Sequence, residues 1–194
     1  MKKSIIIAVA FCALVIALMG FLLVPDEPVG LSSRNLLANA GARGELTKAK
    51  AISAKPPAAA DIRDFSDIGL KSYSLVEAQE VSKNADKYLL MYFWASWCGN
   101  CSFFEQSVLP SPEIVRALND SFAFVSIDFD RSKELARALR LRSVPTFIFL
   151  DPAGEAATVL PGAVPPDIFL MVLNYVSTGS YKTMDFEDYA ETLT

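Results

Sequence analysis

The stretch that decides the fold runs over residues 88–109, YLLMYFWASWCGNCSFFEQSVL. Its first part, Tyr88–Trp94, is apolar throughout, as is typical of a strand that is buried on both faces. Cys98 and Cys101 follow, three residues apart, and residues 102–109 have the character of a helix. The order is strand, short turn, dithiol and helix, which places the start of a helix beside a thiol.

A helix start changes the chemistry of a neighbouring thiol. Helix N-termini carry unpaired backbone N–H groups and a partial positive charge of about half an elementary charge. Both favour the thiolate, which is the reactive form of cysteine. At this spacing the second sulfur lies about one helical turn further on, close enough to close a disulfide. The stretch therefore predicts a redox dithiol made by Cys98 and Cys101.

Other uses of two cysteines at this spacing fit less well. Structural zinc takes about four ligands, whereas the chain has no histidine and its only other cysteine, Cys12, lies in an apolar N-terminal segment. This argues against a metal site within one chain. Attachment of c-type haem needs a histidine directly after the second cysteine, and the chain has Ser102 there. An inert structural disulfide stays open as an alternative.

Composition limits the remaining possibilities. The chain has 194 residues, of which 52% are hydrophobic, enough for one domain of ordinary size with additional segments. Its net charge of −4 gives no general basic surface, so we expect no nucleic-acid partner. The sequence contains no flavin or nicotinamide motif, so we expect no cofactor.

The N-terminus predicts a membrane anchor. Residues 4–24 carry no charge, and a run of about 21 apolar residues is long enough to cross a bilayer as a helix. The nearest A-x-A pattern, at residues 38–40, lies far beyond that run, which favours an uncleaved anchor over a cleaved signal peptide. Lys2 and Lys3 should stay cytoplasmic. We therefore expect a single-pass inner-membrane protein with a periplasmic C-terminal domain, or a periplasmic protein if the segment is cleaved.

The rest of the chain divides by composition. Residues 25–66 are rich in Ala, Pro, Gly, Lys and Ser and predict a flexible linker. Residues 67–180 predict the folded domain, and residues 181–194 an acidic tail that could add a solvated helix. Within the domain, strands are predicted at 88–94, 122–129, 146–150 and 155–160, and helices at 74–86, 98–109, 113–119, 132–141 and 166–176. This alternation, with a hairpin turn at 151–154, predicts an α/β sandwich with a mixed sheet.

Over residues 71–180 the chain resembles the thioredoxin superfamily. The matching motifs are Trp97-Cys98-Gly99-Asn100-Cys101, Ser143-Val144-Pro145-Thr146-Phe147, and Gly162 after the hairpin. The resemblance implies a thioredoxin-like three-layer α/β/α sandwich. Among exported thioredoxin-related proteins, the chain is similar to the C-terminal domain of the DsbD reductase, which also has a glutamate four residues after the second cysteine, here Glu105. It is also similar to SoxW-type proteins in the late pattern Tyr175-Val176, Gly179 and Tyr181-Lys182.

The resemblance implies a role for each site residue. Cys98 corresponds to the nucleophile that attacks a partner disulfide, and Cys101 to the thiol that resolves the mixed disulfide. Pro145 corresponds to the cis proline that packs against the dithiol, leaving the backbone of Val144 free to pair with an extended substrate. Trp97 corresponds to the aromatic residue that shields the dithiol and offers an apolar contact, although ordinary packing is the alternative.

The sequence departs from thioredoxin at two places. Thioredoxin has a buried aspartate six residues before the first cysteine, where this chain has Tyr92, a poor base with a reference pKa of about 10. Glu105, a water or the partner must then deprotonate Cys101, unless Glu105 is only a solvated helix residue. The inner dipeptide, Gly99-Asn100, lacks the histidine that strong oxidases of this fold use. These departures favour the reducing direction.

The sequence thus predicts a membrane-anchored thiol:disulfide oxidoreductase that works mainly as a reductant. Its substrates would be protein disulfides, and its electrons would come from an upstream membrane thiol reductase. A disulfide oxidase or isomerase is the alternative within the same class. A docking or assembly module that uses the fold as a surface, with a passive disulfide, is the alternative of another class.

Overall fold

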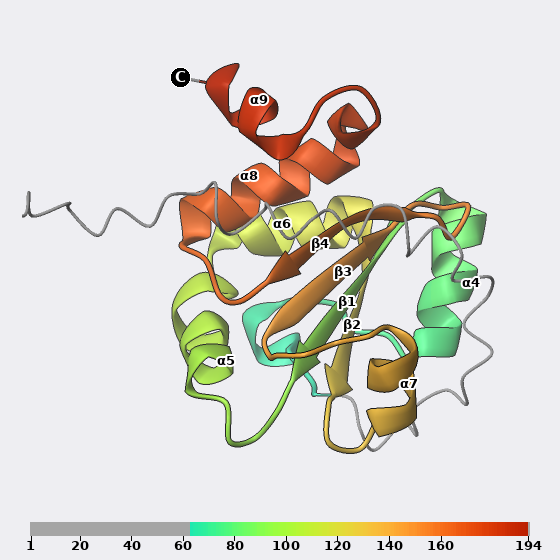
Figure 1. The fold of residues 1–194 in the computed structure, drawn as a ribbon, viewed down its shortest axis with the longest axis vertical. Helices are drawn as coiled ribbons and strands as arrows, with labels where there is room; N and C mark the ends of the chain where they lie inside the picture. The colour runs from blue at the N-terminus through green and yellow to red at the C-terminus, as the bar shows by residue number, and fades with distance from the viewer. Residues whose placement is uncertain (1–62, 194) are drawn as a thin grey trace, which may run out of the picture. The chain divides into compact units, whose positions relative to one another are not determined.

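The computed structural model describes residues 63–193, so the predicted anchor and nearly all of the predicted linker lie outside the described residues. At its centre is a four-stranded sheet in the order β2-β1-β3-β4 (Figure 1). β1 and β2 are parallel, whereas β3 is antiparallel to both β1 and β4. This confirms the predicted mixed sheet. The strands are β1 (Tyr88–Trp94), β2 (Phe122–Asp128), β3 (Thr146–Leu150) and β4 (Ala156–Pro161).

Helices cover both faces of the sheet, and the alternation of side chains along β1 shows how. Leu89, Met91 and Phe93 share a core with residues of α4 and α7, while Leu90, Tyr92 and Trp94 share the other core with the remaining helices. The result is the three-layer arrangement seen in Figure 1. The first face carries α4 (Leu75–Ala85) and α7 (Lys133–Ala138), and the second carries α5 (Gly99–Phe103), η4 (Phe104–Val108), α6 (Pro112–Ser121) and α8 (Pro166–Ser177).

Local sequence explains the starts of α4, α6 and α8. Ser74 and Glu77 form a capping box at the start of α4, each side chain bonding the backbone N–H of the other residue. α6 and α8 both begin with a proline, whose missing N–H has no helical partner at that position in any case.

Two helices differ from the prediction. The helix expected over 98–109 changes to a π-helix at η4, where the N–H of Leu109 donates to the oxygen of Phe104 at 2.9 Å, five residues back. The helix expected over 132–141 ends at Ala138. Arg140 has a φ of 54°, in the left-handed region that L-residues adopt singly and that cannot continue a right-handed helix.

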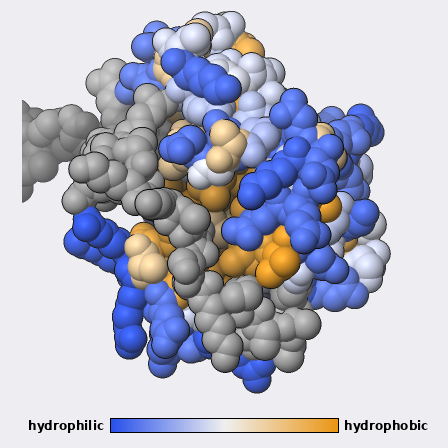
Figure 2. Space-filling view, turned by 90° about the vertical axis from the view of Figure 1, so that its right-hand side faces the viewer, coloured by the Kyte–Doolittle hydropathy of each residue, from blue (hydrophilic) through white to orange (hydrophobic). Residues whose placement is uncertain are grey.

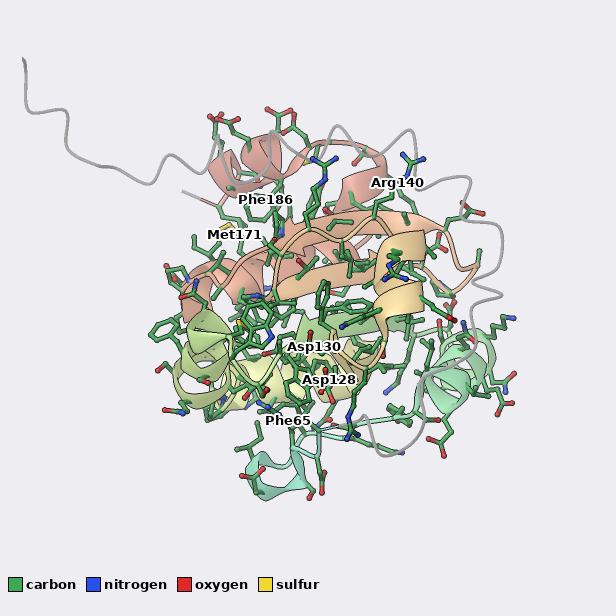
Figure 3. The ribbon with its side chains drawn as sticks, turned by 60° about the horizontal axis from the view of Figure 1, so that its bottom comes forward. Phe65, Asp128, Asp130, Arg140, Met171 and Phe186 are labelled. Atoms are coloured by element: carbon green, nitrogen blue, oxygen red, sulfur yellow. A yellow bond between two sulfur atoms is a disulfide. The ribbon has the colours of Figure 1, made fainter. Side chains whose placement is uncertain are left out.

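The folded part extends beyond both predicted limits, 67 and 180. Before the first, the buried ring of Phe65 lies 5.8 Å from that of Phe124, and η3 (Ser66–Ile68) follows. After the second come η5 (Ser180–Lys182) and α9 (Phe186–Glu191). The hydroxyl of Tyr175 donates to the oxygen of Met184 at 2.7 Å, and the ring of Phe186 packs 5.5 Å from that of Tyr175. The tail therefore packs against α8 through Phe186, while its acidic side chains stay exposed (Figures 1 and 3).

Within residues 63–193, no helix is both long enough and apolar enough to span a membrane. The predicted span at 4–24 is not among these residues.

Candidate functional site

The predicted dithiol is a disulfide at the carboxyl end of β1. Cys98 is the N-cap of α5 and is bonded to Cys101, with an S–S distance of 2.09 Å. The N–H of Cys98 donates to the oxygen of Ala95 at 3.1 Å, which closes the turn after the strand. The N–H of Cys101 points at the sulfur of Cys98 at 3.1 Å. The helix start thus presents a backbone donor to the sulfur atom that the resemblance assigns as the nucleophile.

The two cysteines differ in access to solvent. Cys98 retains 6% of its surface and Cys101 retains 1%, while Gly99 and Asn100 between them are exposed. An incoming group therefore meets Cys98 first. This fits the order of attack that the resemblance implies.

The loop before β3 lies at the same end of the sheet. Antiparallel pairing of β1 with β3 sets Thr146 opposite Phe93, next to the end of β1. The Val144–Pro145 peptide bond is cis, Pro145 is buried, and Val144 is half-buried. The N–H of Gly162 donates to the oxygen of Pro145 at 2.8 Å and holds this loop in place.

Trp97 lies on the surface and is held there by one hydrogen bond. Its side chain is 66% exposed, and its indole N–H donates to Oδ2 of Asp130 at 2.7 Å. Asp130 comes just after β2, and parallel pairing brings the ends of β1 and β2 together. Sequence reasoning assigned Asp130 no role, although a parallel pair of adjacent strands could have indicated its position. Figure 3 shows Asp130 beside Asp128.

A second exposed aromatic follows the dithiol. Phe103, at the end of α5, is 54% exposed. Large apolar side chains at the surface are typical of contact sites when they gather near a functional group. Trp97 and Phe103 therefore offer apolar contacts before and after the dithiol in the chain.

Glu105 is not the solvated helix residue that the sequence left open. Its side chain retains 12% exposure and uses both carboxylate oxygens. Oε1 accepts a hydrogen bond from the hydroxyl of Tyr92 at 2.8 Å, and Oε2 forms an ion pair with the guanidinium of Arg63. Glu105 lies about one helical turn after Cys101, so a fixed carboxylate follows the buried cysteine on the same helical stretch.

Arg63 is fixed by contacts that are distant in sequence. Its guanidinium carbon lies 3.5 Å from the ring centroid of Trp94. Its backbone N–H donates to Oγ of Ser126 at 2.7 Å, and that hydroxyl donates back to the oxygen of Arg63 at 2.9 Å. The sequence placed Arg63 in the linker, and no local pattern could have revealed these contacts.

Tyr92 is the hydrogen-bond donor to Glu105. Burial raises the pKa of its phenol well above the ordinary value, and the negative charge of Glu105 raises it further. Its ring stacks on that of Phe147, with centroids 5.1 Å apart. Tyr92 is therefore neutral at physiological pH, in line with the prediction that it cannot serve as the base.

No metal site competes with this assignment in the part of the chain that the structure describes. Among residues 63–193, no group of three or more Cys, Asp or Glu side chains is arranged to hold a metal ion.

Comparison with known proteins identifies the fold family. Residues 75–177, more than half of the chain, match the family described as the thioredoxin-like domain. The chain belongs to this family. Its members are thiol-disulfide oxidoreductases, and the cysteine pair of that chemistry is present here.

Individual relatives cover the domain and not the whole chain. Thioredoxin from Pyropia yezoensis is 35% identical over 100 residues, which are 51% of this chain and 89% of the relative. The thiol:disulfide interchange protein DsbD of Photorhabdus laumondii is 30% identical over 80 residues, which are 40% of this chain and 14% of DsbD. The solution structure of a thioredoxin from Thermus thermophilus has 33% identity and a TM-score of 0.52, covering 55% of this chain and 86% of that one.

For the first curated relatives, the matched part spans 26% to 82% of the relative's own length. These findings confirm the superfamily and include a DsbD protein among the relatives. The likeness to SoxW-type proteins stays a prediction.

Proposed function

We propose that this protein reduces disulfides in other proteins through Cys98 and Cys101. The observation that carries this proposal is the Cys98–Cys101 disulfide at the start of α5, with Cys98 the more accessible sulfur. In the reduced protein, the Cys98 thiolate attacks a client disulfide, forms a mixed disulfide and releases one client thiolate. Cys101 then attacks Cys98, which releases the second client thiolate and leaves the bond seen in the structure. Two electrons pass to the client.

Cys101 must lose its proton before it attacks, and Glu105 is the proposed acceptor. Glu105 follows Cys101 by four residues, about one helical turn, and in this proposal the proton passes from the thiol to the carboxylate through one water. Each carboxylate oxygen can accept about two hydrogen bonds, so the bonds from Tyr92 and Arg63 leave acceptor capacity. In this proposal the base comes from the helix, whereas thioredoxin has one in the strand.

The direction and the location are parts of the same proposal. The Gly99-Asn100 dipeptide carries no histidine to stabilise a strongly oxidising thiolate, which supports the reducing direction. Similarity to part of a DsbD protein and the apolar segment at residues 4–24 support a periplasmic site of action with a membrane thiol reductase as donor. Each turnover needs such a dithiol donor to return the disulfide to two thiols.

The reduction potential tests this function directly. We would equilibrate the full chain in detergent against glutathione or dithiothreitol buffers and measure the reduced fraction. A potential near −270 mV, the value of thioredoxin, supports a reductase, whereas a value near −120 mV would make the protein an oxidase. A disulfide that none of these buffers reduces would show a structural bond and overturn the proposal. Cys98→Ser is expected to abolish client reduction, and Cys101→Ser to trap the mixed disulfide.

A further inference from the structure

The charge of the segment over residues 131–142, here called the basic segment, is opposite to that of the chain. It contains five cationic side chains and one acidic one, a net charge of +4, whereas the whole chain has −4. The remaining residues therefore carry −8. The five cations are Arg131, Lys133, Arg137, Arg140 and Arg142.

All five cationic side chains are exposed. The fold places the two ends of the segment at the end of the sheet that carries the dithiol, while α7 packs on the opposite face from α5. The segment starts directly after Asp130, which accepts the indole N–H of Trp97. It ends directly before the loop of Val144 and Pro145, which leads to the end of β1. Figure 2 shows the side of the domain that carries α4 and α7, where hydrophilic side chains cover much of the surface. Figure 3 labels Asp130, which directly precedes the segment, and Arg140, which lies within it.

The two carboxylates at the start of the basic segment are already engaged by other groups. Oδ1 of Asp128 accepts the N–H of Asp130 at 2.8 Å and that of Arg131 at 3.3 Å, and Oδ2 of Asp130 accepts the bond from Trp97. Within the segment, Glu134 is the one carboxylate against five cations. These hydrogen bonds come from neutral donors and leave both aspartates charged, so residues 128–142 carry five cationic and three acidic side chains, a net charge of +2. This stretch is therefore positive, although the protein is acidic.

We infer that the basic segment is the docking surface for protein clients that carry acidic side chains next to their disulfide. This inference rests on the proposed function, because the dithiol and the segment must act on the same molecule. Opposite charges attract a client as it approaches and raise association rates by about 10- to 1,000-fold. Trp97 then supplies the apolar contact at the dithiol itself. The segment selects the client, and Cys98 and Cys101 carry out the exchange.

The test compares three disulfide-bonded peptides of equal length, whose flanking residues are glutamate, serine or lysine. The second-order rate constant for reduction by the reduced full chain is measured at low and at 1 M salt. We expect the glutamate peptide to react about tenfold faster than the lysine peptide at low salt, and the difference to vanish at 1 M, where the Debye length is about 3 Å. The triple variant Lys133→Glu/Arg137→Glu/Arg142→Glu should reverse the preference.

A matched variant separates local from overall charge. Lys83→Glu/Arg116→Glu/Lys182→Glu changes the net charge equally, at exposed positions on α4, α6 and η5, and should keep the preference for the glutamate peptide. If both variants lose the preference equally, or if the wild type has none while it reduces all peptides, the docking surface is wrong and the reductase function stands. If the reduced wild type reduces none of the peptides, even at 1 M salt, the function itself fails. Binding of the chain to an unrelated nucleic acid as tightly as to the glutamate peptide would also contradict the inference.

Discussion

The surroundings of Cys98 and Cys101 differ in their exposure to solvent and in their hydrogen bonding. On the side of Cys98, an exposed tryptophan donates one hydrogen bond to an exposed aspartate. On the side of Cys101, Tyr92, Glu105 and Arg63 form a connected group that is largely buried. Charges in such an environment are screened little, whereas exposed charges are screened by water and salt. Under the proposed function, the exposed side serves contact with partners and the buried side controls the second, internal step.

The largest effect is expected from Glu105→Gln. The change removes the carboxylate but keeps its shape, so the attack of Cys98 should be nearly unchanged while resolution by Cys101 slows about 100-fold, the low end for loss of a general base. Rapid-mixing experiments that follow formation and decay of the mixed disulfide separate the two steps. The matched control is Glu80→Gln, an exposed position in α4, which should affect neither.

The Arg63→Ala variant tests whether Glu105 contributes to resolution by Cys101 through its charge or only through packing. This variant keeps the carboxylate but removes its ion pair, at a cost of about 1–3 kcal/mol in the free energy of unfolding. If Glu105 is the proton acceptor, Arg63→Ala retains most of the resolution rate and its dependence on pH, which Glu105→Gln loses. Equal slowing by both variants at equal loss of stability would show that Glu105 has only a structural role.

The features that depend on residues close together in the sequence were the ones that could be predicted. β1, β3 and the capping box of α4 depend on neighbouring residues, and the sequence predicted them within a residue. The dithiol was predicted for the same reason, since its strand, turn and helix are consecutive. Local pattern could not reveal the left-handed residue that ends α7, because arginine seldom adopts that conformation.

Contacts between distant residues were missed or left open. The role of Glu105 stayed undecided because its partners, Tyr92 and Arg63, come from β1 and from a segment that composition assigned to the linker. Tyr175 and Phe186 likewise belong to a cluster that exists only once α8 and α9 have packed. In each case one partner came from a stretch that composition assigned elsewhere, Arg63 from the linker and Phe186 from the acidic tail, and tertiary packing decided its environment.

A smaller effect is expected from Tyr92→Phe. Because burial raises the pKa of Tyr92 in the folded state, the unfolded chain releases this proton above about pH 10 while the folded chain keeps it. Stability therefore falls as pH rises above about 10, by about 1.4 kcal/mol per pH unit for one such group, and is unaffected by this group below that pH. Tyr181, whose pKa burial also raises, contributes in the same direction.

The phenylalanine variant should lose about half of this alkaline dependence. At neutral pH it should cost about 1 kcal/mol, because Glu105 loses one hydrogen bond. Urea unfolding between pH 7 and 11 measures both quantities, with Tyr73→Phe as the control. An unchanged slope above pH 10 would show that Tyr92 is not the protected phenol.

The smallest effect is expected on the exposed side, from Asp130→Asn. The asparagine oxygen can still accept the indole N–H of Trp97, and the lost charge is exposed to solvent. We expect the free energy of unfolding to change by less than about 0.5 kcal/mol and the rate of client attack at moderate salt to change less than about threefold, because exposed charges are screened within about 10 Å. Stopped-flow tryptophan fluorescence gives the rate. A tenfold loss of rate with stability intact would mean that the aspartate charge, and not only the position of Trp97, governs the first step, and the division between a contact side and a control side would then be wrong.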